Sequence, residues 1–169
     1  MFNVLGFREG GVAAAMVEWG ALHALWEKWA SACVGYSDAG EPLKAAILLN
    51  NNCDLEVSAS SRHLPVIVEQ KGMKLRPTDV RQLIERVKQN NLQTDFFFID
   101  ASKYLVTSVH DHWYCARCVN ATSPAGKGAI VVQTAAFILV TIYEGSIGAA
   151  SEAMAATDYL MEQLNRRNL

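Results

Sequence analysis

The second half of the chain contains a series of short strand-like segments joined by short links. Each segment is apolar or alternates apolar with polar residues, which is typical of β-strands. Parallel neighbours need long crossover connections, whereas antiparallel neighbours can be joined by tight turns. The spacing therefore predicts an antiparallel sheet in a domain of the α+β class. The predicted strands are Phe96–Ile99, Tyr104–Val109, Trp113–Val119, Ala129–Gln133 and Ala136–Tyr143.

A further hairpin is predicted before these strands. Lys44–Leu49 is an apolar run, Leu55–Ser60 alternates, and the polar turn Asn50–Asp54 between them suits a tight connection, so we expect the two segments to pair. The following segment, His63–Lys74, can be a loop or an edge strand, because Pro65 lacks a backbone N–H while the residues after it favour an extended chain.

Three helices are predicted around the sheet. The first, Met16–Cys33, carries large apolar residues at steps of three and four, which places them on one face. The second starts at Pro77, whose fixed φ suits a first helical turn, and the third follows the break at Gly145–Gly148 and ends near Asn165. Their expected core stripes are Trp19, Leu22, Trp26, Trp29 and Cys33; then Val80, Leu83, Ile84 and Val87; then Ala150, Met154, Thr157, Leu160, Met161 and Leu164.

Length and composition indicate one globular domain. With 169 residues, 51% hydrophobic and 19% charged, the chain can bury a substantial core. We expect an N-terminal extension over residues 1–15 and the domain over 16–169. The net charge of −2 provides no general attraction for nucleic acid, so none is expected as a partner. The chain shows no secretory signal pattern, and its longest apolar stretch, Ile130–Tyr143, is too short and polar to span a bilayer, which predicts a cytoplasmic protein with reduced cysteines.

The sequence shows no recognised catalytic constellation. Nucleotide-binding, metalloprotease and hydrolase signatures are all missing. Lys127 lies between Gly126 and Gly128, a composition found in phosphate-binding loops, but the strand–loop–helix context is missing and a hairpin loop is expected instead. We therefore expect no catalytic residues, no cofactor and no enzymatic activity.

The segment HDHWYCARC could supply zinc ligands, since His110, His112, Cys115 and Cys118 lie close together. The same segment is also predicted to be a strand. In a strand, Cys115 and Cys118 point to opposite faces, so a single ion could not easily be surrounded. We favour paired strand residues over a metal site.

Two tryptophans of the first helix raise a different possibility. Trp26 and Trp29 are neighbours on the helix surface because they are three residues apart. The simpler interpretation is core packing. The functional interpretation is an aromatic groove for proline-rich peptides, completed by Tyr159, which lies off the core stripe of the last helix. This interpretation requires that the terminal helices lie side by side and leave the rings uncovered.

The order and spacing of several short motifs resemble the profilin family over roughly Trp26 to Leu164. The motifs include two aromatics on the first helix, an Ala-Ala-Ile strand, a proline-started helix, a Gly-rich loop and a final hairpin followed by a helix. They are Trp26–Trp29 (WEKW), Ala45–Leu48 (AAIL), Pro77–Val80 (PTDV), Lys103–Val106 (KYLV), Arg117, Ala125–Gly128 (AGKG), Phe137–Glu144 (FILVTIYE) and Asp158–Gln163 (DYLMEQ).

The resemblance implies a fold and a function. The implied fold is a central antiparallel sheet with the N- and C-terminal helices on one face and smaller helices on the other. Profilins bind monomeric actin, regulate its polymerisation and bind proline-rich proteins such as formins, so a cytoplasmic, cytoskeletal role is implied. An interaction module for a different protein is the alternative. By position, the resemblance implies actin contacts at Val80, Lys103, Arg117, Ser108, Ala150 and Ala155, poly-proline contacts at Trp26, Trp29 and Tyr159, and phosphoinositide contacts at Arg76, Arg81, Arg86 and Lys88.

Overall fold

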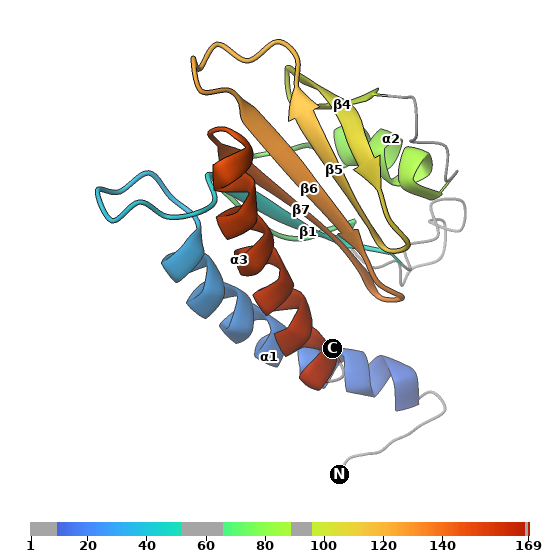
Figure 1. The fold of residues 1–169 in the computed structure, drawn as a ribbon. Helices are drawn as coiled ribbons and strands as arrows, with labels where there is room; N and C mark the ends of the chain where they lie inside the picture. Colours follow the sequence, from blue (N-terminus) through green and yellow to red (C-terminus); the bar gives the residue numbers. More distant parts are fainter. Residues whose placement is uncertain (1–9, 52–65, 89–95, 168) are drawn as a thin grey trace.

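A single antiparallel sheet forms the centre of the molecule. The computed structural model describes residues 10–51, 66–88, 96–167 and 169. Its seven strands lie in the order β2-β1-β7-β6-β5-β4-β3, and each neighbouring pair is antiparallel (Figure 1). The elements are α1 (Gly10–Cys33), β1 (Ala45–Asn50), β2 (Ile67–Lys71), α2 (Pro77–Lys88), β3 (Phe96–Ile99), β4 (Ser102–Val109), β5 (Trp113–Cys118), β6 (Lys127–Gln133), β7 (Phe137–Glu144) and α3 (Ile147–Arg166).

The sheet separates two hydrophobic clusters. The terminal helices α1 and α3 pack together on one face, here called the helix side, whereas α2 packs on the opposite face, here called the α2 side (Figure 1). Residues alternate along each strand between the two clusters: in β1, Ala46 and Leu48 belong to the helix side, and Ile47 and Leu49 to the α2 side. The predicted α+β architecture, with both terminal helices on one face, is confirmed.

The sequence of α2 accounts for its position. Pro77 occupies the first turn, Asp79 lies near the N-terminus, and Arg86 and Lys88 lie in the last turn, so the charges complement the helix dipole. The predicted apolar stripe of α2 is fully buried and fixes the helix on the sheet.

Helix α3 buries a polar contact against the sheet. The hydroxyl oxygens of Thr141 on β7 and Thr157 on α3 lie 2.9 Å apart, and the Thr157 hydroxyl donates to the Ala153 carbonyl at 2.8 Å. Both side chains are completely buried, so these bonds satisfy groups that would otherwise be costly to remove from water. The predicted stripe is confirmed at Thr157, Leu160, Met161 and Leu164, whereas Ala150 and Met154 are only half-buried.

Three details differ from the sequence predictions. Helix α1 begins at Gly10, earlier than the expected Met16. Lys127 is the first residue of β6 and not part of a hairpin loop. The pairing predicted for β1 is also wrong, because β2 and β7 occupy its two edges. The predicted partner, Leu55–Ser60, lies outside the described residues.

Neither α1 nor any other helix in the described part of the chain is long and apolar enough to cross a membrane.

Candidate functional site

Among the described residues, no helix covers the part of the helix side that lies over β5, β4 and β3. Helix α3 packs on β7 and β6 and does not extend over β5, β4 and β3 (Figure 1). Along β3 and β4, Phe97, Ile99, Tyr104 and Val106 point into the α2-side cluster, so the residues between them point to the uncovered face. We call this surface the open sheet face; it consists of Phe96, Phe98, Lys103, Leu105, Arg117 and Val119.

Strand register makes these side chains one continuous surface. Phe96 is opposite Leu105, which is in turn opposite Arg117, so they form one row across three strands. Phe98 is opposite Lys103, and the Val119 amide donates to the Lys103 carbonyl at 2.8 Å, which gives a second row. Side chains in register across a sheet are close enough to interact directly.

The open sheet face exposes large apolar groups. Phe98 and Val119 are 57% and 56% exposed, and Leu105 is 42% exposed. Single exposed apolar residues are common, but a contiguous group of them marks an interaction surface. The ring centres of Phe96 and Phe98 are 6.4 Å apart in an edge-to-face arrangement, which is a favourable geometry for an aromatic pair.

Two cations belong to the open sheet face: Lys103 lies within it, between Phe98 and Val119, and Arg117 lies at the β5 end of the other row. The Lys103 ammonium lies 3.9 Å from the centre of the Phe96 ring, a cation–π distance. Arg117 is held more firmly: its Nη1 donates to the Gly145 carbonyl at 2.8 Å, and its guanidinium lies 5.8 Å from the centre of the Tyr143 ring. Arg117 therefore ties β5 to the segment that leads into α3, as well as adding charge to the surface.

Several of the residues predicted to contact actin lie on the helix side of the sheet, whereas one of them is buried on the α2 side. Lys103 and Arg117 lie on the open sheet face. Ser108 is opposite Cys115, a residue of the helix-side cluster, so it lies on the same side of the sheet. Ala155 is exposed on α3. Val80 is only 1% exposed, because it packs between α2 and the sheet, and the prediction that its side chain contacts a partner is therefore wrong.

Four residues of the open sheet face were missed by the sequence analysis: Phe96, Phe98, Leu105 and Val119. The segment FFFI is apolar throughout, which is typical of a strand buried on both faces. The exposure of these residues depends on the tertiary structure, that is, on how far α3 extends over the sheet. No local sequence pattern encodes this.

The predicted aromatic groove is closed. Trp26 and Trp29 do lie where the terminal helices meet, with ring centres 5.3 Å apart, but they are only 2% and 3% exposed. The Trp29 indole N–H donates to the Ala156 carbonyl of α3 at 2.9 Å. The expectation that both indoles are uncovered is therefore wrong. Tyr159 is 56% exposed, in keeping with its predicted place off the core stripe.

The cysteines of the HDHWYCARC segment face different environments. Cys115 packs with the helix-side cluster and Cys118 with the α2-side cluster, as the strand interpretation predicts. Burial raises the pKa of the Cys115 thiol, which makes it less reactive. His110 stacks on Trp113 with ring centres 3.8 Å apart. Among the described residues, no group of three or more His, Cys, Asp or Glu is placed to hold a metal ion.

The basic residues of α2 form no organised site. Arg76 pairs with Asp79, its Nε lying 3.3 Å from a carboxylate oxygen. The hydrogen bonds from Arg76 hold the pKa of Asp79 below its usual value. Arg81 and Lys88 are exposed along the helix. Phosphoinositide binding through this face stays a prediction.

Comparison with known proteins agrees with this architecture. Profilin IB of Acanthamoeba castellanii is 18% identical, with a TM-score of 0.50; the match covers 72% of this chain and 87% of that chain. LokiProfilin1, solved in a complex with rabbit actin, is 9% identical, with a TM-score of 0.59 and coverage of 86% and 94%. At these low identities, the structural likeness shows a shared fold only. No curated protein matches the chain. The family model for profilin matches residues 28–169, which include the whole sheet, α2 and α3. The chain therefore belongs to the profilin family.

Proposed function

We propose that this protein binds monomeric actin through the open sheet face and so regulates actin polymerisation. The observation that carries this proposal is an exposed apolar surface of Phe98, Leu105 and Val119 that also contains the cations Lys103 and Arg117. Protein interfaces are enriched in aromatic residues and arginine relative to the rest of the surface, as this one is. Membership of the profilin family supports actin as the partner, and it supports action in the cytoplasm as a binding protein and not as an enzyme.

The direct test uses purified protein and actin monomers. Replacing Lys103 by Glu reverses a charge within the surface, and replacing Leu105 by Asp adds a charge to its apolar part. We expect each change to weaken the complex by about tenfold or more. A few residues contribute most of the binding free energy of an interface, and a reversed or newly buried charge among them is unfavourable. Arg81→Glu is the matched control, since Arg81 is exposed on α2, on the other side of the sheet.

Sedimentation velocity measures the complex, and the rate of actin assembly measures the effect on polymerisation. A wild-type protein that neither forms a complex nor changes assembly would overturn the proposal. Equal losses in Lys103→Glu and Arg81→Glu would show that the open sheet face is not the contact.

A second candidate is a different protein bound to the same face. Ala150 and Ala155 present only methyl groups at positions where the family resemblance implies actin contacts, and this favours an altered partner. A competition experiment distinguishes the two candidates. If actin also binds the open sheet face, added actin displaces the other partner; if actin does not bind there, the partner stays bound.

We also propose proline-rich peptides, such as those of formins, as partners. Their binding site would differ from the aromatic groove predicted from the sequence. The exposed ring of Tyr159 favours this proposal. Because Trp26 and Trp29 are buried, a peptide would stack on Tyr159 without reaching the indoles.

A further inference from the structure

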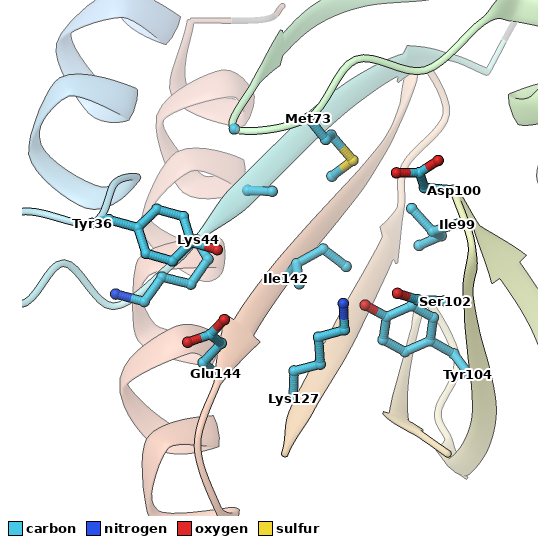
Figure 2. Close-up of a pocket in the computed structure, with 12 residues that line it drawn as sticks. Tyr36, Lys44, Met73, Ile99, Asp100, Ser102, Tyr104, Lys127, Ile142 and Glu144 are labelled. Carbon is cyan, nitrogen blue, oxygen red and sulfur yellow. The ribbon is translucent and has the colours of Figure 1, made fainter. Parts of the chain in front are cut away.

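A small pocket lies at one end of the sheet, on the α2 side (Figure 2). It has a volume of about 150 Å³ and is formed by the ends of β1, β6 and β7, the turn between β3 and β4, and the residues at 36 and 72–73. A water molecule takes up roughly 30 Å³ in the liquid. The pocket is therefore too small for a drug-sized ligand and suits a small ion or metabolite.

The inner wall of the pocket provides hydroxyl groups. Tyr104 is 1% exposed, and its ring stacks on Phe97 with centres 5.6 Å apart, so the position of its hydroxyl is fixed. Ser102, two residues earlier on β4, also lines the pocket and lies on the same face of the sheet as Tyr104. Burial raises the pKa of Tyr104 far above its usual value, so this hydroxyl remains a proton donor at every physiological pH.

Lys127 supplies a positive charge inside the pocket. In the strand register Lys127 is opposite Glu144, yet their side chains diverge: Lys127 extends toward the hydroxyl of Tyr104, while Glu144 lies near Tyr36 (Figure 2). Among the described residues, no hydrogen-bond acceptor or carboxylate is within bonding distance of the Lys127 ammonium. A half-buried ammonium without a partner is an available site for an anion.

Three other charged residues line the pocket: Lys44, Asp100 and Glu144. Lys44 donates to the Gly35 carbonyl at 3.2 Å and its ammonium lies 4.9 Å from the centre of the Tyr36 ring. The carboxylates of Asp100 and Glu144 belong to exposed residues, so water screens them more than it screens the interior. The lining of the pocket thus combines the Lys127 ammonium with the hydroxyl groups of Ser102 and Tyr104.

We propose that this pocket binds a small free oxyanion, a phosphate or a carboxylate, with Lys127 as its charge partner and Ser102 and Tyr104 as hydrogen-bond donors. Lysine commonly contributes such a point charge to phosphate and carboxylate sites. The pocket lies on the α2 side and the open sheet face on the helix side, so this inference does not rest on the proposed actin contact.

Isothermal titration calorimetry at neutral pH and fixed ionic strength tests the proposal. The probes are sodium phosphate and sodium acetate, each measured against a sodium chloride reference. We expect one of them to bind with a Kd of about 1 mM or tighter. Tighter binding of phosphate assigns the site to phosphoryl groups, and tighter binding of acetate assigns it to carboxylates.

Lys127→Gln should weaken that binding by about tenfold, the loss expected for one charge-assisted hydrogen bond. Tyr104→Phe, which keeps the stacked ring and removes only the hydroxyl, should weaken it to a smaller extent. Lys28→Gln, a change on the exposed surface of α1, should leave it unchanged. The proposal is overturned if neither anion binds the wild-type protein, or if Lys127→Gln binds as tightly as Lys28→Gln.

Discussion

At the scale of single residues, Trp29 shows how one hydrogen bond assigns an aromatic side chain to the core. Its indole N–H is buried and donates to the Ala156 carbonyl. We expect Trp29→Phe, which keeps an aromatic ring but removes the donor and part of the volume, to lower the free energy of unfolding by about 1–3 kcal/mol. Urea denaturation followed by circular dichroism measures this change.

Tyr159→Ala is the matched contrast, because Tyr159 is an aromatic residue on α3 that is largely exposed. Its free energy of unfolding should change by no more than about 0.5 kcal/mol, whereas its affinity for polyproline should fall. A tyrosine variant with full peptide affinity would disprove the proposed peptide contact. A Trp29→Phe protein as stable as the wild type would mean that the buried hydrogen bond makes no net contribution to the free energy of unfolding.

The sequence predicts which of these residues share a helix face, but not which of them are accessible. The spacing of Trp26 and Trp29 places them together, and the structure confirms it. Their burial depends on how closely α3 approaches α1, which no local pattern encodes. Val80 was predicted both as a core residue of α2 and as an actin contact, and the structure agrees with the core prediction, which came from the apolar stripe and not from the family motif.

At the scale of elements, one ion pair links α1 to the edge strand β2. Nδ1 of His23 lies 2.8 Å from a carboxylate oxygen of Glu69, and Glu27 is a second carboxylate nearby at 3.9 Å. The hydrogen bond to Glu69, followed by the negative charges of Glu69 and Glu27, raises the pKa of His23 above its ordinary value of 6.5. The imidazolium therefore stabilises the folded state.

This contribution has a definite sign. Because the folded pKa is the higher one, the stabilisation is complete below 6.5 and is lost as the pH rises through the folded pKa. We expect the wild-type protein to lose more stability than His23→Gln between about pH 5.5 and about pH 8.5. Denaturant unfolding at both values measures the difference, with His112→Gln as a surface control. Identical pH profiles for wild type and His23→Gln would contradict the assignment.

The order of elements follows from the sequence more securely than their pairing. The strands from Phe96 onward and helix α2 lie where apolar periodicity and Pro77 indicate. The neighbour of β1 was predicted wrongly because a local hairpin is the simplest pairing for two adjacent segments. The structure instead pairs β1 with β2 across a longer connection, which local patterns do not reveal.

At the scale of the whole molecule, both hydrophobic clusters are built on one sheet. Every strand that contributes to the helix side also contributes alternate residues to the α2 side. Neither cluster can be lost without disrupting the other, so we expect one cooperative unfolding transition. In a Trp113→Phe background, tryptophan fluorescence reports only from α1, and its midpoint in urea should coincide with that of far-ultraviolet circular dichroism. An earlier fluorescence midpoint would show that α1 detaches before the sheet unfolds.

The close approach of β6 and β7 at Gly128 has a consequence for how this chain can vary. A methyl group at position 128 would overlap the phenol of Tyr143, the residue directly opposite. That phenol in turn lies beneath the Arg117 guanidinium. The two positions are therefore coupled: any side chain at 128 requires the ring at 143 to move or to become smaller, and either change removes the aromatic surface beneath the arginine.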